Sequence, residues 1–341
     1  MQKNVLIKEI VLKSTNLEIT RFIAALLVIF SHAFPITMGN SNSEWLYFIT
    51  DGQLELGSFA VCLFFLCGGY LTMRSMEHSK GTIKYIVRRF FRIVPVLMFV
   101  VVVCIITGAF ISTLSFKEYF TNTLTYRYLL NGVMILSHNL PGVYEDAVYG
   151  PVVNGALWSL PVEFACNVLG AIAYNMNLLS RKNFKFTVPV IAVFGVAVYI
   201  FGGRMPVIRE ILRPCLVFYM GMLYYVYSDK IPTKYYLLAA SAVLLVISSL
   251  TGLLYIGVVL CVPYIFIFLW FNTKQRFKKV SALGKYAYAM YVWGFPVQQF
   301  VAMCFGWNIS PYLNALISSA AVVVLAYLTY HLIENPKKIR G

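Results

Sequence analysis

The sequence predicts an all-α, polytopic membrane protein: a helix bundle with about ten transmembrane helices. Composition is the first reason, because 60% of the 341 residues are hydrophobic and 12% are charged, whereas soluble domains carry about 25% charged residues. The second reason is that long apolar runs recur along the whole chain. A helix needs roughly 17 to 25 such residues to cross the hydrocarbon core. We therefore expect one integral membrane domain over 1–341.

The predicted spans cover 17–38, 56–74, 91–114, 155–176, 187–202, 208–227, 235–251, 254–271, 283–305 and 311–333. The segment before them, 1–16, is polar and basic, and the first apolar run lacks a clear small-residue cleavage site, so we expect a retained first span and no cleavable signal peptide. The longest connection, 115–154, contains Pro141-Gly142 and Gly150-Pro151. It is predicted to be an extracytoplasmic lid or acceptor-binding loop with a short interfacial helix near Tyr126 to Leu136.

Positive charge is unequal on the two sides of this ten-span arrangement. Nearly all Lys and Arg residues fall on one side, and the other side holds only Lys117, Arg127, Arg204 and Arg209. Cytoplasmic loops carry such an excess, so both termini, including 1–16, are predicted to be cytoplasmic and the protein to be a multi-pass plasma membrane protein. The formal net charge of +15 then faces anionic lipid. No nucleic-acid partner is expected, since no basic run is interleaved with stacking aromatics.

The seven cysteines all lie in apolar runs, and their spacing matches neither a metal site nor a redox site. We interpret them as small hydrophobic residues. No metal is expected.

Four ionisable residues fall inside predicted spans: Arg21, His32, Glu163 and Arg213. A charge near the bilayer centre costs about 2.5 to 3.5 kcal/mol, so each needs a partner, a water-filled cavity or a function. Arg21 and His32 are eleven residues apart, which is three helical turns plus about 20°, and roughly 16 Å along the axis. They are therefore predicted to share one helix face and one cavity.

Glu163 follows Pro161 and is predicted to lie at the same depth as His32, so the two side chains could pair. The carboxylate would then orient the imidazole as a general base. Structural alternatives stay open: His32 in a helix-to-helix hydrogen bond, Arg21 reaching the inner surface, and Glu163 paired with Arg213. The other histidines, His78, His138 and His331, are expected in solvated or interfacial positions.

A basic cluster, Arg88-Arg89-Phe90-Phe91-Arg92, lies at the cytoplasmic mouth of the third span. Such charge can simply set the topology. Guanidinium groups also bind phosphates through paired hydrogen bonds, so the cluster could hold a phosphorylated cytosolic ligand.

At these residues the chain resembles acyltransferase family 3, the integral membrane O-acyltransferases that include polysaccharide and peptidoglycan O-acetyltransferases. Arg21 and His32 match its Arg-x10-His motif, and Arg89 to Arg92 its Arg-x-x-Arg element. Further similar segments are Phe64-Phe65-Leu66-Cys67-Gly68-Gly69-Tyr70-Leu71, Leu157-Trp158-Ser159-Leu160-Pro161-Val162-Glu163 and Leu283-Gly284-Lys285-Tyr286-Ala287-Tyr288-Ala289-Met290-Tyr291. Two positions depart from the family pattern, because Gly68 replaces a common Ser and Gly294 replaces a His found in many members.

The resemblance implies an O-acyltransferase that uses cytosolic acetyl-CoA, or another small acyl-CoA, as donor substrate, with no permanently bound cofactor. The acceptor would be a hydroxyl of a cell-surface or lipid-linked glycan. Membrane lipid and other envelope glycan-assembly proteins are the further expected partners. Arg89 and Arg92, with Arg88, would bind the donor phosphates, helped by Arg21.

His32 would act as general base beside Glu163, and Trp158, Ser159, Tyr288 and Tyr291 would form a supporting pocket. Polar groups such as Ser159, Tyr288 or Tyr291 could stabilise the oxyanion. Direct transfer and a transient acyl-His32 intermediate both remain open. The alternative from another class is a transporter or flippase of a lipid-linked saccharide without acyl chemistry.

Overall fold

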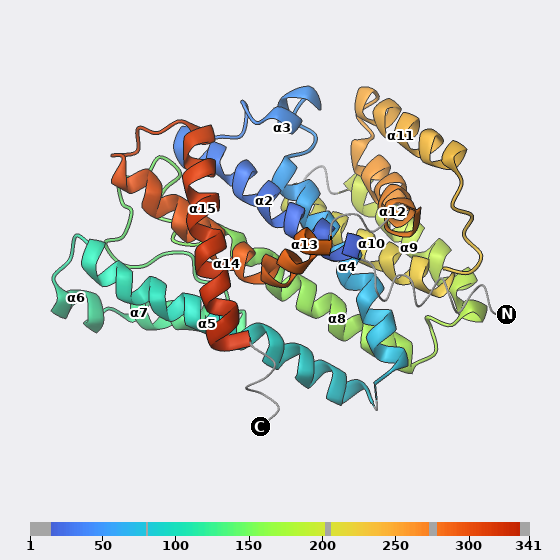
Figure 1. Cartoon of the computed structure of the whole chain (residues 1–341), viewed down its shortest axis with the longest axis horizontal. Helices are drawn as coiled ribbons and strands as arrows, with labels where there is room; N and C mark the ends of the chain where they lie inside the picture. Colours follow the sequence, from blue (N-terminus) through green and yellow to red (C-terminus); the bar gives the residue numbers. More distant parts are fainter. Residues whose placement is uncertain (1–14, 80, 202–205, 273–277, 335–341) are drawn as a thin grey trace.

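The computed structural model describes residues 15–79, 81–201, 206–272 and 278–334, and within these ranges the regular structure is entirely helical (Figure 1). The predicted all-α class is thus confirmed. The long helices are α2 Thr15–Met38, α4 Leu56–Glu77, α5 Thr82–Ile111, α8 Ser159–Asn175, α9 Arg181–Phe201, α10 Pro206–Val226, α11 Tyr235–Leu250, α12 Leu254–Asn272, α14 Ala287–Cys304 and α15 Pro311–Thr329. The short ones are α3 Trp45–Ile49, α6 Phe116–Thr121, α7 Thr123–Tyr128, η1 Leu129–Val133, η2 Gly155–Trp158, α13 Lys278–Ser281, η4 Ala282–Tyr286 and η5 Tyr330–Glu334.

Six helical segments in the described ranges are long and apolar enough to cross a membrane: Asn16–Met38, Leu56–Glu77, Thr82–Ile111, Gly155–Asn175, Leu254–Asn272 and Pro311–Glu334. The other predicted spans also coincide with helices, namely α9, α10, α11 and α14. Of these, α11 is apolar but shorter, with 16 residues. Ten crossings and cytoplasmic ends stay predictions, and the terminal segments 1–14 and 335–341 lie outside the described residues.

Helix α4 lies at the centre of the bundle, in contact with α2, α8 and α10. Its approach to α10 is close enough to exclude side chains. A Cβ at Gly69 would lie 1.9 Å from the carbonyl oxygen of Phe218, and a Cβ at Gly221 would lie 2.4 Å from that of Leu66. Small residues allow helix backbones to approach in membranes, where van der Waals packing drives association. The Gly69–Gly221 contact therefore fixes α10 against α4.

Helix α8 runs beside α4 in the same direction. A Cβ at Gly68 would lie 3.3 Å from Oε1 of Glu163, and one turn further along both helices the Thr72 hydroxyl lies 2.7 Å from Oδ1 of Asn167. Because equal steps along the two helices keep the contacts in register, positions before Gly68 on α4 lie toward the same end of the bundle as positions before Glu163 on α8.

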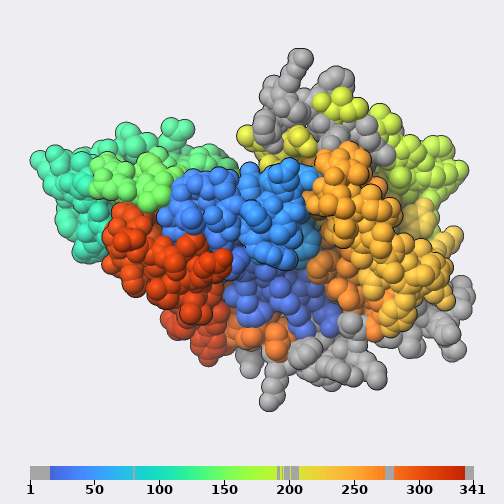
Figure 2. Space-filling view, turned by 90° about the horizontal axis from the view of Figure 1, so that it is seen from above, coloured from blue at the N-terminus to red at the C-terminus, as the bar shows by residue number. Residues whose placement is uncertain are grey.

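The remaining elements surround this centre (Figure 1). Helices α14 and α15 pack on α2, and α11 packs on α12. The chain from 116 to about 150, teal to green in Figure 2, forms one end of the molecule, opposite the orange helices α11 and α12. Within the predicted long connection, α7 and η1 end at Val133, so the helical part begins and ends slightly before the predicted range near 126–136.

Candidate functional site

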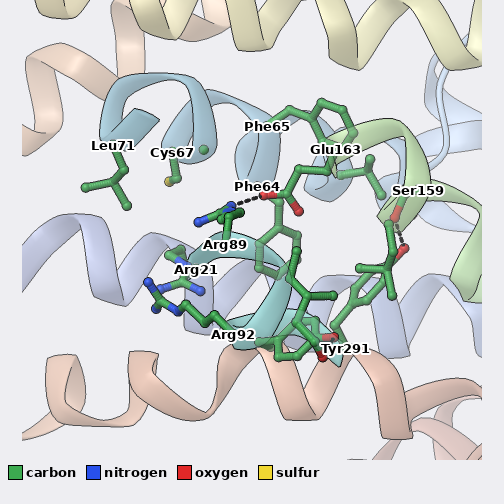
Figure 3. Close-up of a pocket in the computed structure, with 15 residues that line it drawn as sticks. Arg21, Phe64, Phe65, Cys67, Leu71, Arg89, Arg92, Ser159, Glu163 and Tyr291 are labelled. Carbon is green, nitrogen blue, oxygen red and sulfur yellow. Dashed lines mark hydrogen bonds and ion pairs between the residues drawn. The ribbon is translucent and has the colours of Figure 1, made fainter. Parts of the chain in front are cut away.

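The candidate site is a cavity of about 70 Å³ enclosed by α2, α4, α5, α8 and α14 (Figure 3). Its lining residues are Arg21, Val61, Phe64, Phe65, Cys67, Gly68, Leu71, Arg89, Arg92, Ile93, Ser159, Leu160, Glu163, Tyr288 and Tyr291. Seven of the predicted site residues are in this set: Arg21, Arg89, Arg92, Ser159, Glu163, Tyr288 and Tyr291. Segments from the first and last thirds of the sequence therefore meet at one cavity.

An ion pair between Arg89 on α5 and Glu163 on α8 crosses the cavity. The guanidinium Nη2 lies 2.5 Å from the carboxylate Oε1, and the two side chains are 19% and 20% exposed. The predicted pairing of Glu163 with His32 is wrong for this structure, because the carboxylate pairs with Arg89. The alternative pairing with Arg213 does not form either, since that guanidinium pairs with Glu210 on its own helix.

A cluster of buried polar side chains supports this pair one helical turn further along α8. The Asn167 side chain donates to the backbone carbonyl of Glu163 at 2.7 Å and accepts from the hydroxyls of Thr72 and Tyr85, each at 2.7 Å. Thr72 and Asn167 are almost fully buried. Buried polar groups are stable when they are hydrogen-bonded in this way. The cluster therefore links α4, α5 and α8 one helical turn after Glu163.

Thr72, Tyr85 and Asn167 are not among the residues predicted for the site. The sequence does contain a signal for Asn167, because it is a polar residue inside an apolar span, four residues or about one helical turn after Glu163. Thr72 and Tyr85 carry no such signal, since neither residue type is unusual in or beside an apolar helix.

Three arginines gather at one end of the cavity (Figure 3). Arg21 pairs with Glu18 at 3.3 Å and Arg89 pairs with Glu163, whereas Arg92 forms no ion pair with any residue in the described ranges. Arg92 is exposed at the edge of the cavity that it lines, and Arg88 differs from it in position and partner. Arg88 is exposed, does not line the cavity, and donates to the Ser79 hydroxyl at 2.7 Å.

The hydroxyl groups at the opposite end of the cavity already have hydrogen-bond partners in the protein. The hydroxyl of Tyr291 donates to the carbonyl of Ala156 at 2.7 Å and accepts from Ser159 at 2.6 Å. Tyr288 lies nearer the arginines, because its hydroxyl donates at 2.9 Å to the carbonyl of Ile93, the residue after Arg92. These hydroxyl protons point to protein partners, so the residues act here as wall and scaffold. Trp158, the residue before α8, is not among the lining residues.

His32 is on α2, as predicted, but it does not line the cavity that holds Arg21. The expectation of one shared cavity is therefore wrong for this structure. The imidazole packs against the ring of Phe295 on α14, with centroids 5.4 Å apart. Its Nδ1 is buried and has no hydrogen-bond partner in the part of the chain that the structure describes. Phe295 follows Tyr291 by one helical turn, so α14 presents one ring to the cavity and the next to His32.

The cavity wall also contains residues outside the predicted set, including Val61, Phe64, Cys67 and Leu160. Phe64 and Cys67 belong to the segment that carried the family resemblance, but apolar residues in an apolar span give no signal of their own. The seven cysteines are all free, and Cys67 is one of the buried ones.

The described residues therefore form an all-helical bundle with apolar, membrane-spanning helices and a cavity lined by three arginines. The profile of acyltransferase family 3, an acyltransferase domain, matches residues 14–331, and the chain belongs to this family. It is 24% identical over 340 residues to an O-acetyl transferase of Shigella phage Sf6, covering 95% of this chain and 96% of that protein. No solved structure matches the chain. The resemblance inferred from the motifs is confirmed, and O-acyl transfer is the activity that these matches support.

Proposed function

We propose that this chain transfers a small acyl group from a cytosolic acyl-CoA to a hydroxyl of a cell-surface or lipid-linked glycan. The observation that carries the proposal is the polarity of the cavity, with three arginines at one end and uncharged side chains at the other. An acyl-CoA has the same polarity, with phosphates at one end and a small neutral acyl thioester at the other. The phage relative is described as an O-acetyl transferase, which favours acetyl as the group transferred.

The arginine end suits the donor phosphates. Guanidinium groups bind phosphate oxygens in a bidentate manner. Arg92 has no ion-pair partner within the described ranges, and the Glu18 partner of Arg21 could be exchanged for a phosphate oxygen, whereas Arg89 keeps Glu163 and uses its remaining N–H groups. The cavity of about 70 Å³ is smaller than the roughly 300 to 1,000 Å³ of typical ligand pockets. We therefore place only the acyl-bearing end of the donor inside it and the nucleotide at its mouth.

Glu163 then has a different role from the one that the sequence favoured. Its carboxylate holds Arg89 in the cavity through the 2.5 Å contact, and its backbone is held by Asn167. In the proposal, Glu163 orients Arg89 for the donor instead of orienting the imidazole.

His32 is proposed to accept the proton of the acceptor hydroxyl as its oxygen bonds to the thioester carbon; the carbon–sulfur bond then breaks and the proton passes to the departing CoA thiolate. Its unpartnered Nδ1 is available for this, and a general base must come within about 3 Å of that proton. His32 does not line the cavity in this structure, so the acyl group reaches the imidazole only after the packing of Phe295 against it changes. Direct transfer and an acyl-His32 intermediate are both compatible with this arrangement.

The test is transfer of radiolabel from [14C]acetyl-CoA to the glycan fraction of membrane vesicles that contain the chain. Vesicles from the same cells without the chain are the control. The proposal expects label in glycan that rises with the amount of protein. A saccharide transporter or flippase would move glycan without labelling it, so absence of label at every protein level would overturn the proposal.

A further inference from the structure

The uncharged end of the cavity has a defined size and chemistry. Five of the lining residues belong to it: Val61, Phe64, Ser159, Leu160 and Tyr291. We propose that this end selects the acyl group, restricting the enzyme to short neutral acyl chains, and that Phe64 is the residue that sets the limit on length. This inference rests on the function proposed above, because it assumes that an acyl-CoA is the donor.

The register of the helices places this end away from the arginines. Gly68 on α4 is level with Glu163 on α8, and Val61 and Ser159 precede these residues by two turns and one turn. Figure 3 shows Arg21 and Arg92 on one side of the cavity and Ser159 on the opposite side, with Tyr291 beside it. A donor with its phosphates on the arginines therefore directs its acyl group toward Phe64 and Ser159.

The wall at this end is held by hydrogen bonds and by an aromatic contact. Tyr291 is fixed by its hydrogen bonds to Ala156 and Ser159. The Phe64 ring packs edge-on against Tyr291, with centroids 5.6 Å apart and an interplanar angle of 73°. Protein interiors at this density tolerate an added methylene poorly. Because neither ring can move without breaking these contacts, a longer acyl chain meets Phe64.

A charged acyl group is excluded from this end of the cavity, as a long one is. None of the five residues at this end carries a charge, and the hydroxyls of Ser159 and Tyr291 already have partners. A succinyl chain would place its carboxylate here without a cation, and an unpaired buried charge is strongly unfavourable. The nearest cations are the arginines, which the donor phosphates occupy in the proposed complex.

The experiment compares kcat/KM for acetyl-, propionyl-, butyryl- and succinyl-CoA as donors in vesicles containing the chain. The variants are Phe64→Leu and Val61→Ala, both of which enlarge this end. The matched control is Phe91→Leu, because Phe91 is 66% exposed and does not line the cavity. The ratio of propionyl to acetyl activity is the readout, since it does not depend on how much of a variant folds.

A hydrophobic pocket discriminates one methylene by about 10- to 200-fold. We therefore expect wild type to favour acetyl over propionyl by at least about tenfold, and Phe64→Leu to reduce that preference by about tenfold or more. Val61→Ala is expected to shift the ratio in the same direction, and Phe91→Leu to leave it unchanged. Succinyl-CoA should stay a poor donor throughout.

Two results would overturn the inference while leaving the proposed function intact: acetyl transfer in both cavity variants with the wild-type ratio, or a wild-type enzyme that prefers succinyl-CoA. If no acyl-CoA labels glycan even with the wild-type chain, the proposed function fails, and the inference fails with it. The two failures are thus distinguishable.

Discussion

Tyr291 and Phe295 lie one turn apart on α14 and have different neighbours: Tyr291 lines the arginine-containing cavity, and Phe295 packs against the imidazole of His32. The proposed donor site and the proposed general base therefore contact successive turns of α14.

The separation of the two sites predicts a split between chemistry and donor binding. His32→Ala is expected to lower kcat by at least about 100-fold, the contribution typical of general-base catalysis, and to leave the Kd of acetyl-CoA within about twofold. Transfer assays and calorimetry on the purified protein measure the two quantities. His78→Ala is the control, because His78 is exposed at the end of α4. Equal weakening of donor binding and kcat in His32→Ala would contradict this separation.

The Arg89–Glu163 pair predicts a coupled effect on stability. Removing one member of a buried pair costs about 3 to 5 kcal/mol because it leaves an unpaired charge, and we expect a smaller cost, about 1 to 3 kcal/mol, for these one-fifth exposed groups. Glu163→Gln, Arg89→Gln and the double variant form the cycle, measured by thermal unfolding in detergent. The double variant should lose clearly less stability than the sum of the single ones. Additive losses would show that the pair contributes nothing.

The polar cluster of Thr72, Tyr85 and Asn167 predicts losses of stability that differ between variants. Tyr85→Phe removes one of two hydroxyls bound to Asn167 and should lower the free energy of unfolding by about 1 kcal/mol. Asn167→Leu removes the acceptor of the Thr72 hydroxyl and leaves Tyr85 only its 3.0 Å contact with that hydroxyl, so it should cost about 1 to 3 kcal/mol or more. It should also raise the KM for donor, because Glu163 loses its backbone contact. An Asn167→Leu protein as stable as Tyr85→Phe would count against the cluster.

The close contact of α4 and α10 predicts a contrast between adjacent glycines. Gly69→Ala places a Cβ 1.9 Å from a backbone oxygen, and should cost about 3 kcal/mol or abolish folding, since overpacking of this kind forces backbone shifts. Gly68→Ala meets only the side chains of Glu163 and Phe218 at 3.3 Å, so its loss should be small. Yield and melting temperature of the two purified variants give the comparison, and equal losses would contradict the role of Gly69.

Much of the helical organisation could be predicted from the sequence, because spans in lipid are determined by apolar length and composition. Arg21, Arg89 and Glu163 could also be selected, since ionisable residues in apolar spans need partners. The choice of partner could not be predicted. Depth alone made His32 and Glu163 candidates for pairing, but the rotation of α8 about its axis decides that Glu163 faces Arg89, and that rotation depends on contacts such as Thr72 with Asn167.

The same limit applies to the cavity wall and to the basic cluster. Phe64 and Val61 do not stand out in spans full of aromatic and branched residues, so only the packed structure identifies them. Arg88 and Arg92 belong to the same basic run of the sequence. In the structure Arg88 donates to Ser79, whereas Arg92 lines the cavity. Tertiary contacts decide which way the Arg88 and Arg92 side chains on α5 point, and the sequence does not show those contacts.

This difference between two arginines gives the most direct test of the claim that the cavity is the donor site. The measurement is the Kd of acetyl-CoA for the purified protein and for Arg92→Ala and Arg88→Ala. A hydrogen bond to a charged group contributes about 1.5 to 3 kcal/mol, which is roughly tenfold or more in affinity. We predict that Arg92→Ala weakens binding by at least about tenfold and that Arg88→Ala changes it less than about twofold. Wild-type affinity in Arg92→Ala, or equal weakening in both variants, would contradict the assignment of the cavity.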